Sequence, residues 1–323
     1  MSSSKMQSSL FAAAILAATG IATGAKATCQ DLVAAFDRAV AARSAEAARR
    51  ALADISDDVV CGARIDEFRG KLVDFLVKYA GAAGITRTDR DHAIAMAQGT
   101  LEISRNWQGA ETLADYFMSR GDKLNAHHWY EQSVSFLNTD PSIVATPIER
   151  RILLTKLAAA QSLVNDDEEG KKPIRYVPPM RAVDGSLCGI YCKVLLRGAA
   201  VVNVPIPINF YTNETRFTPT GDRAMQELVE AVAAEHVQTM KLIGHADPRG
   251  TPQYNMDLSR RRVEAVRDKL LQELQRQGIR ADIRIDWKGA QQPFDVSVLP
   301  YTPSQEEIWQ LCRRVEWVHD AVP

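Results

Sequence analysis

The stretch from residue 240 to residue 277 constrains the fold most strongly, because a strand signal and a helix signal are joined there by a short glycine-containing loop. Met240 to Gly244 is a short apolar run, which predicts a buried strand. From Asp257 to Gln277 apolar residues recur every three or four positions, which predicts an amphipathic helix. A buried strand followed by such a helix indicates a sheet with helices packed on it.

The rest of the C-terminal third alternates strand and helix signals in the same way. Strands are expected at Val201–Phe210, Ile283–Trp287 and Arg314–Val318, and helices at Thr220–Ala234 and Ser304–Cys312. Pro205 and Pro207 predict that the first of these strands is irregular or lies at a sheet edge, because proline cannot donate a ladder hydrogen bond. The order predicts a βαβαβ(α)β domain with helices packed on a mixed sheet.

Residues 31 to 165 carry a helical pattern, with about six helices in three antiparallel pairs. The clearest pair runs from Ala110 to Asn138 and turns at Gly121-Asp122. Its small residue Ala126 and its aromatic residue Tyr130 fall where a tetratricopeptide repeat places such packing residues. The region weakly resembles these repeats, and a plain helical bundle is the alternative. The predicted fold class is α+β, with an all-α helical-pair domain first.

The N-terminus has the features of a secretory signal. An apolar stretch from Leu10 to Ala25 follows Lys5, and Ala25-Lys26-Ala27 is a small-x-small cleavage pattern. We expect a signal peptide at 1–27. The stretch is shorter than the ~20 apolar residues of a membrane span, and we expect no transmembrane span in the mature chain. A lipid on Cys29 is the alternative, although Lys26 stands where a lipoprotein signal has a larger apolar residue.

Export permits disulfides, because the compartment outside the inner membrane is oxidising. The simplest pairing joins Cys29 to Cys61 and Cys188 to Cys192, and leaves Cys312 with a free thiol buried in a helix. The cysteine spacings match no common zinc site, so we expect no metal and no cofactor.

Charge and proline content divide the chain further. Removing residues 1–27, which carry two lysines and no acids, changes the formal net charge from −1 to −3, so nothing attracts nucleic acid in bulk. A run of charged residues from Asp166 to Lys172 is followed by three prolines, which is typical of a linker. We therefore expect a helical domain at 28–165, a linker with a short disulfide-prone segment at 166–200, and a second domain at 201–323.

One motif in the second domain is specific. It begins with Gly244-His245-Ala246-Asp247 and continues with Gly250, Asn255, Leu258-Ser259 and Arg261-Arg262-Val263. With Arg313-Arg314-Val315-Glu316 near the end, this pattern resembles the OmpA-like domain family, and within it the peptidoglycan-associated lipoproteins. The resemblance covers roughly residues 201 to 318. The sequence departs from the pattern at Cys312, where the family has asparagine, and in the long proline-rich stretch from Gln291 to Pro303.

The resemblance implies a binding site for the diaminopimelate of peptidoglycan stem peptides. In the family an aspartate takes the ammonium group and an arginine takes the carboxylate, and the matching residues here are Asp247 and Arg262. One anion and one planar cation suit the zwitterionic end of diaminopimelate. His245, Gly250 and Asn255 are expected to support the loop. A purely structural ion pair between Asp247 and Arg262 is the alternative.

The resemblance implies a non-catalytic cell-wall anchor in the periplasm, associated with peptidoglycan and suited to a place at the outer membrane. The helical domain would then present a surface to another envelope protein. One alternative is an OmpA-fold scaffold that does not bind the wall. Another is a peptidoglycan-remodelling enzyme, which is disfavoured because the chain has no nucleophile elbow and no His-Glu-x-x-His motif. His127 and His128 are adjacent, so on a helix they diverge.

Overall fold

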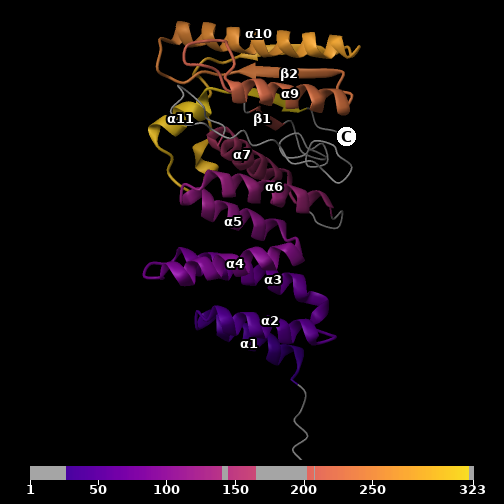
Figure 1. The fold of residues 1–323 in the computed structure, drawn as a ribbon, viewed down its shortest axis with the longest axis vertical. Helices are drawn as coiled ribbons and strands as arrows, with labels where there is room; N and C mark the ends of the chain where they lie inside the picture. The colour runs from indigo at the N-terminus through magenta and orange to yellow at the C-terminus, as the bar shows by residue number, and fades with distance from the viewer. Residues whose placement is uncertain (1–26, 140–144, 165–201, 207, 320–323) are drawn as a thin grey trace, which may run out of the picture.

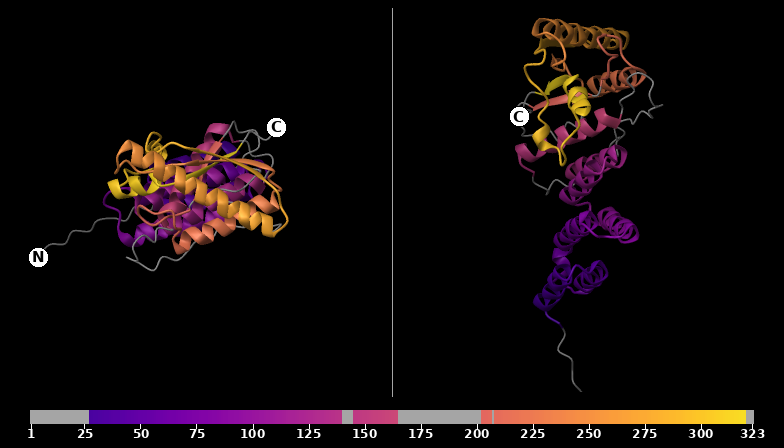
Figure 2. Two further views of the ribbon diagram at one scale, coloured as in Figure 1. Left: turned by 90° about the horizontal axis from the view of Figure 1, so that it is seen from above. Right: turned by 90° about the vertical axis from the view of Figure 1, so that its left-hand side faces the viewer.

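The computed structural model describes residues 27–139, 145–164, 202–206 and 208–319. The molecule is elongated, with helices stacked along its long axis and an α/β domain at one end (Figures 1 and 2). The predicted signal peptide apart from Ala27, the whole of the predicted linker and the Cys188–Cys192 pair lie outside the described residues.

The N-terminal part is a stack of paired helices. Within the described residues it holds seven α-helices, one more than the sequence pattern suggested, because the segment up to residue 164 forms its own helix. Neighbouring helices pack as α1 with α2, α3 with α4, and α5 with α6, and the last helix packs on α6. The helices are α1 (Cys29–Ala41), α2 (Ala45–Asp57), α3 (Ile65–Gly81), α4 (Arg87–Ser104), α5 (Trp107–Ser119), α6 (Lys123–Thr139) and α7 (Pro147–Val164), with a short 3₁₀ turn, η1 (Gly62–Arg64).

The α5–α6 pair shows how the sequence specifies this stack. Asn106 caps α5, since its side chain accepts a hydrogen bond from the Gly109 amide at 2.7 Å. Gly121 makes the turn between the helices at a φ of 81°, which glycine adopts without strain. Ala126 and Tyr130 are both fully buried, as the repeat-like pattern predicts. The arrangement is consistent with a tetratricopeptide-like stack.

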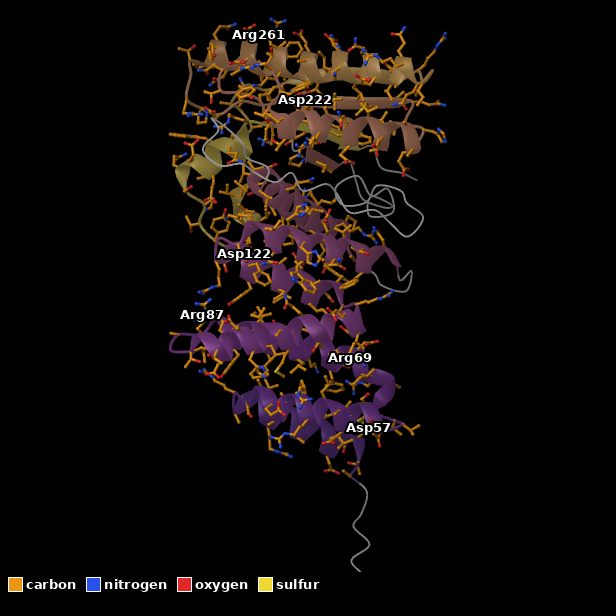
Figure 3. The ribbon with its side chains drawn as sticks, viewed as in Figure 1. Asp57, Arg69, Arg87, Asp122, Asp222 and Arg261 are labelled. Carbon is orange, nitrogen blue, oxygen red and sulfur yellow. A yellow bond between two sulfur atoms is a disulfide. The ribbon has the colours of Figure 1, made fainter. Side chains whose placement is uncertain are left out.

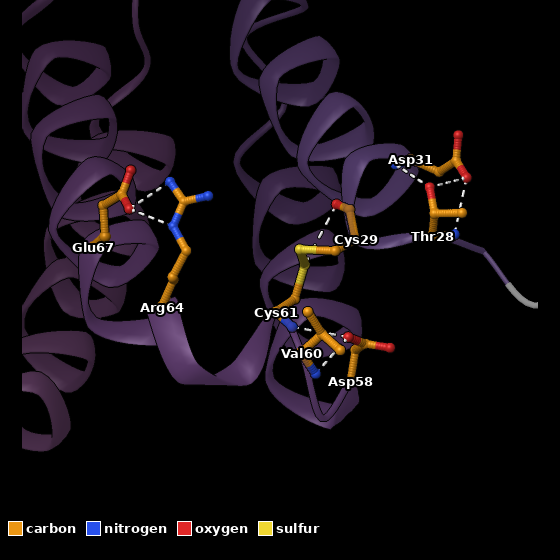
Figure 4. The surroundings of a disulfide bond; sticks show 8 residues. All are labelled: Thr28, Cys29, Asp31, Asp58, Val60, Cys61, Arg64 and Glu67. Atoms are coloured by element: carbon orange, nitrogen blue, oxygen red, sulfur yellow. Dashed lines mark hydrogen bonds and ion pairs between the residues drawn. A yellow bond between two sulfur atoms is a disulfide. The ribbon is translucent and has the colours of Figure 1, made fainter.

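A disulfide between Cys29 and Cys61 closes the first helical pair (Figure 4), and this prediction is confirmed. It joins the start of α1 to the loop after α2 across a Cα–Cα distance of 5.3 Å. The Asp58 carboxylate orders that loop by accepting hydrogen bonds from the amides of Val60 and Cys61. Because the Cys29 sulfur is in this bond, it is not available for a lipid, which disfavours the lipoprotein alternative. Cys312 has a free, buried thiol, as predicted.

The C-terminal part is an α+β domain, as predicted. Its described sheet has the order β1-β4-β2-β3, in which β2 and β3 are parallel and the other pairs are antiparallel. The first strand lies at one end of this sheet, as Pro205 suggested. The elements are β1 (Val202–Ile206), α9 (Pro219–Ala234), β2 (Thr239–Gly244), α10 (Pro252–Arg276), β3 (Asp282–Trp287), the 3₁₀ turn η4 (Val296–Val298), α11 (Gln305–Cys312) and β4 (Val315–His319).

The strand register separates an apolar face of the sheet from a polar one. Val204 and Leu242 both pair with Trp317, so the three side chains share one face, and all three are buried. Helix α10 packs against β2 and β3. A Cβ atom added at Gly244 would lie 2.3 Å from the Ser259 carbonyl oxygen of α10, so glycine is what allows this close approach.

Helix α10 begins five residues before the predicted start at Asp257. Thr251 caps it by accepting a hydrogen bond from the Tyr254 amide, and Pro252 takes the first helical position. Arg262 therefore lies about three turns into the helix.

Helix α7 joins the two parts of the molecule. It lies between α6 and the sheet domain (Figure 1), where it contacts β1, η4 and α11. Leu153 and Leu157 are fully buried, and the helix is buried around most of its circumference because it is covered on two sides. The buried apolar residues of both parts form one continuous cluster.

Polar contacts cross the same junction. The Gln310 side chain of α11 donates to the Ser162 carbonyl of α7 at 2.9 Å. The Lys123 ammonium at the start of α6 lies 3.1 Å from the Glu307 carboxylate and 3.7 Å from the centre of the Tyr301 ring. The helical stack and the sheet domain are thus packed together through α7 and α11. Across the described ranges, no helix combines the length and the hydropathy that crossing a membrane requires.

Candidate functional site

A pocket of about 250 Å³ opens where the loop after β2 meets α10 and the end of α11. It brings together residues from four separate segments of the sheet domain. Both predicted ligand-binding residues line it, as does Asn255 from the predicted supporting loop. The lining residues are Thr212, Asn213, Ala246, Asp247, Arg249, Tyr254, Asn255, Leu258, Arg262 and Arg313.

Asp247 is the only carboxylate among these lining residues, and two arginines hold it. The Arg249 guanidinium donates from Nε to Oδ1 and from Nη2 to Oδ2, each at 3.0 Å, and the Arg249 amide donates to Oδ1 at 3.1 Å. Arg313 Nη1 donates to Oδ2 at 3.4 Å. Burial would raise the pKa of the Asp247 carboxyl, but the hydrogen bonds from Arg249 outweigh it and hold this pKa below its usual value. Asp247 is therefore an anion at neutral pH.

The two arginines that hold Asp247 are placed by different elements. Arg249 lies in the loop after β2, with its side chain 39% exposed, and its guanidinium carbon lies 4.6 Å from the centre of the Trp309 ring of α11. This cation–π contact fixes the guanidinium beside Asp247. Arg313 directly follows α11, and its side chain is only 9% exposed. Helix α11 therefore shapes one wall of the pocket.

Arg262 lies deep in the pocket and is only 2% exposed. Its Nε donates to the Glu214 carbonyl at 3.1 Å, and its Nη2 donates to the Tyr211 carbonyl at 3.3 Å. Its guanidinium carbon also lies 5.0 Å from the centre of the Phe210 ring. These contacts orient the guanidinium from behind. The hydrogen bonds of Arg262 thus go to backbone carbonyls, whereas Asp247 is held by Arg249 and Arg313. The geometry therefore does not favour a simple structural ion pair between Asp247 and Arg262.

His245 lies behind the pocket rather than in it. The side chain is 1% exposed, and its Nε2 lies 3.3 Å from Oε2 of Glu316 on β4. Burial lowers the pKa of His245, so the ring is neutral at pH 7. Glu316 also accepts hydrogen bonds from Arg314 at 2.7 Å and from Asn203 at 3.1 Å. The buried polar cluster around Glu316 therefore links β4 to the end of β2, from which the loop with Asp247 begins.

The loop itself is tight at Gly250. A Cβ atom there would lie 2.6 Å from Asn255 Oδ1, so only glycine fits without displacing that side chain. The Asn255 amide nitrogen lies 3.5 Å from the Gly250 carbonyl oxygen, which ties the loop to the first turn of α10. Gly250 and Asn255 thus occupy positions that suit the supporting role expected for them.

Sequence reasoning missed Arg249 and Arg313 as pocket residues, and it missed Trp309 as the ring that packs against Arg249. The spacing of Asp247 and Arg249 is a local signal, because residues two apart in a tight loop can form an ion pair. Arg313 was part of the recognised Arg-Arg-Val-Glu element, but no sequence pattern shows that its side chain reaches Asp247. Trp309 could be assigned only from the position of α11 in space.

The comparisons with known proteins agree with this geometry. The OmpA family model matches residues 209–301, the segment that carries Asp247, Arg262 and the loop between them. The chain has an OmpA-family domain. This domain is of the C-terminal, peptidoglycan-binding type, and it is typical of envelope proteins associated with peptidoglycan. No curated protein matches the chain.

The OmpA domain belongs to a family whose members are typically non-catalytic. The two adjacent histidines of the helical part differ in burial. His127 is buried, and burial lowers its pKa to about 4, whereas His128 is exposed. In the part of the chain that the structure describes, no cluster of three or more His, Cys, Asp or Glu side chains could hold a metal ion.

Proposed function

We propose that this protein is a non-catalytic periplasmic anchor whose OmpA domain binds the diaminopimelate residue of peptidoglycan stem peptides. Asp247 receives the ammonium group of the free diaminopimelate end, and Arg262 receives its carboxylate. The observation that carries the proposal is the shared pocket, which is lined by one ionised carboxylate and a buried guanidinium inside an OmpA-family domain. Charge-assisted contacts to both groups of one zwitterion suit such a pocket.

The chemistry of the two groups supports these roles. Asp247 is charged, because its pKa is held below the usual range. Arg262 is oriented from behind by the Tyr211 and Glu214 carbonyls, so little side-chain entropy is lost when it binds a carboxylate. Both side chains are largely removed from water, which strengthens their contacts with ligand charges.

Retention on purified sacculi tests the function against its two alternatives. The full chain should pellet with sacculi at a saturable stoichiometry and release no soluble muropeptides. Release of muropeptides that increases with time would instead support a remodelling enzyme. A folded protein that stays in the supernatant would support an OmpA-fold scaffold without wall binding. Arg261→Ala serves as a control, since Arg261 lies on the outer part of α10 (Figure 3) and pairs with Asp257.

The location follows from the predicted signal peptide and is part of the same proposal. Export should remove residues 1–27 and leave Thr28 as the first residue. Thr28 caps α1, and its backbone nitrogen donates to the Asp31 carboxylate at 2.9 Å. The new α-ammonium group would keep this contact as an ion pair at a helix start. N-terminal sequencing of the exported protein tests the processing, and an intact Met1 would contradict it.

We also propose that the helical domain presents a surface to a second envelope protein. Val59 and Val60, in the loop after α2, are 88% and 72% exposed. Helix α2 belongs to the helical pair at the end of the stack opposite the OmpA domain (Figure 1). Adjacent exposed apolar residues suit a protein contact. Pull-down from envelope extract with the full chain should recover a protein that Val59→Asp/Val60→Asp loses. Leu271→Asp, at an exposed position of α10, is the matched control and should retain it.

A further inference from the structure

Helix α11 has one side on the helical stack and another on the pocket. Glu307 and Gln310, three positions apart, lie on the stack side, where Gln310 donates to the Ser162 carbonyl of α7. Trp309, and Arg313 four positions later at the end of the helix, lie on the pocket side. The helix is only eight residues long, so a shift of its stack side also moves its pocket side.

The pocket side of α11 contributes to how Asp247 is held. Arg313 Nη1 donates directly to Asp247 Oδ2 at 3.4 Å. The Trp309 ring packs against the Arg249 guanidinium, at 4.6 Å from its carbon, and Arg249 makes the bidentate contact with Asp247. The position of α11 therefore affects both arginines that orient the Asp247 carboxylate.

On the stack side, the Lys123 ammonium group of α6 contacts two residues of the sheet domain. It lies 3.1 Å from Glu307 Oε1 and 3.7 Å from the centre of the Tyr301 ring. The Tyr301 hydroxyl donates to the same carboxylate at 3.0 Å. The Lys123 and Glu307 side chains are only 17% and 25% exposed, so their ion pair is less screened by solvent than a surface pair.

Glu307 is also the residue that fixes the start of α11. Its carboxylate accepts a hydrogen bond from the Ser304 amide at 2.8 Å, as part of a capping box. Burial would raise the pKa of the Glu307 carboxyl, but the Ser304 amide and the Lys123 ammonium group hold this pKa below its usual value. Glu307 is therefore an anion at neutral pH, and Lys123 pairs with the carboxylate that caps the helix.

Both departures of this chain from the OmpA pattern lie at the same junction. Tyr301 belongs to the long proline-rich stretch Gln291–Pro303, and η4 within that stretch contacts α7. Phe294, in the same stretch, donates its amide to Cys312 Sγ at 3.5 Å, and both residues are buried. The atypical stretch thus packs α11 and the loop before it against the helical stack.

We propose that Lys123 of the helical stack is a positioning residue for the diaminopimelate pocket, which acts through Glu307 and α11 on the contacts of Asp247. The inference rests on the proposed function and deepens it. With Lys123 in place, α11 is docked before the ligand arrives. Without it, α11 is held by fewer contacts, and the pocket wall must be ordered each time a ligand binds, which lowers affinity. The helical stack thus contributes to wall binding without touching the ligand.

Calorimetric titration of the full chain with the tripeptide L-alanyl-γ-D-glutamyl-diaminopimelate tests the proposal. Lys123→Met keeps an unbranched apolar side chain but removes the charge. It should weaken binding about fivefold, which corresponds to about 1 kcal/mol and to the ordering of one side chain. Lys123→Arg should bind as tightly as the wild type, because a guanidinium group also pairs with carboxylates and lies over aromatic rings. Each variant is first shown by thermal unfolding to be folded at the titration temperature.

Lys71→Met is the matched control. Lys71 also pairs with a glutamate, Glu67 at 2.8 Å, and its ammonium group also lies near an aromatic ring, 5.0 Å from the centre of Phe68. Both of these partners are on α3 itself, within the helical stack. The variant should therefore bind the tripeptide like the wild type.

A double variant tests whether the effect passes through α11. Arg313→Gln removes the direct contact between the end of α11 and Asp247. Adding Lys123→Met to Arg313→Gln should therefore weaken binding further by about twofold or less, because the two changes interrupt the same connection. A general loss of stability would instead weaken binding by the same factor in both backgrounds.

Equal or tighter binding by Lys123→Met than by the wild type would overturn the proposal. A loss that persists undiminished in Arg313→Gln, or that Lys123→Arg or Lys71→Met shares, would overturn it as well. A wild-type protein that does not bind the tripeptide would instead contradict the proposed function itself, so the two failures are distinguishable.

Discussion

Arg249 forms a bidentate ion pair with Asp247, in which Nε donates to Oδ1 and Nη2 donates to Oδ2, each at 3.0 Å. The residue expected to receive a ligand cation is thus paired with an arginine of the protein itself. Arg262, the expected partner for the ligand carboxylate, is instead oriented by backbone carbonyls. The two predicted binding residues are therefore oriented in different ways: Asp247 by an ion pair with an arginine side chain, and Arg262 by hydrogen bonds to backbone carbonyls.

The Cys29–Cys61 disulfide should stabilise the helical stack. It closes a loop with a sequence separation of 32, and a loop of this length corresponds to about 3–4 kcal/mol of stabilisation in the chain-entropy account. Cys29→Ser/Cys61→Ser should lower the free energy of unfolding by that amount in urea titrations. Cys312→Ala, which removes a buried thiol outside any bridge, should cost less. Equal stability of the double variant and the wild type, or free Cys29 and Cys61 thiols in protein from the periplasm, would contradict this.

Helix α7 should couple the unfolding of the two parts. Leu157 is fully buried at the junction, and Leu157→Ala should cost about 2–5 kcal/mol. Because the core is continuous, calorimetry should show one thermal transition that moves as a whole to lower temperature. Ile148→Ala on the same helix is the control, since Ile148 is 62% exposed and should change little. Two separate transitions, of which only one shifts, would argue against a shared core.

Glu316 should make stability fall in acid. Burial would raise the pKa of Glu316, but hydrogen bonding to His245 and Arg314 and the positive charge of Arg314 lower it to about 2. Because this folded-state pKa lies below the unfolded value of 4.5, the carboxylate contributes stability above pH 4.5, and the contribution is lost as the pH falls toward 2. The difference between these two pKa values corresponds to about 3 kcal/mol at neutral pH.

The comparison of Glu316→Gln with the wild type measures that contribution directly. The variant should be less stable at pH 7, and the difference should shrink steadily as the pH is lowered from about 4.5 to about 2. Asp282→Asn provides a control, since the Asp282 side chain is 57% exposed and forms only a surface ion pair with Arg284. A difference between Glu316→Gln and wild type that does not vary with pH would show that the carboxylate charge is not what stabilises the cluster.

The sequence predicts the sheet domain well because its signals are local. The apolar run at Met240 predicts β2, and the periodic apolar residues of α10 predict that helix. The apolar pattern places the start of α10 too late, because the first turn carries no apolar repeat and is specified instead by the Thr251 cap and the proline that follows it. The extra helix α7 was missed as a separate element because the pattern gives helical character but not the number of helices.

Some residues of the site can likewise be predicted from local sequence, and others cannot. Asp247 and Arg262 could be found from the motif, since Asp247 lies in the loop after β2 and Arg262 lies in the helix that directly follows this loop. The roles of Trp309 and Arg313 could not, because they depend on how α11 packs against the loop after β2, some 60 residues earlier in the chain. The contacts of α7 with both parts of the molecule also depend on tertiary packing, so the sequence does not predict them. Charge and proline content indicate only where the boundary between the two domains lies.

The most direct test of the account is titration of the diaminopimelate tripeptide into wild type, Asp247→Ala, Arg262→Lys and the double variant, each first shown to be folded. Asp247→Ala should weaken binding at least about thirtyfold, because truncating one member of a desolvated charge pair costs about 2–5 kcal/mol. Arg262→Lys should lose a large part of the binding as well. Lysine should not replace Arg262, since an ammonium group cannot make a planar two-point contact. The double variant should lose much less than the sum of the two, because both residues bind one zwitterion. If Asp247→Ala and Arg262→Lys both bind the peptide as tightly as the wild type does, this pocket is not a cell-wall binding site.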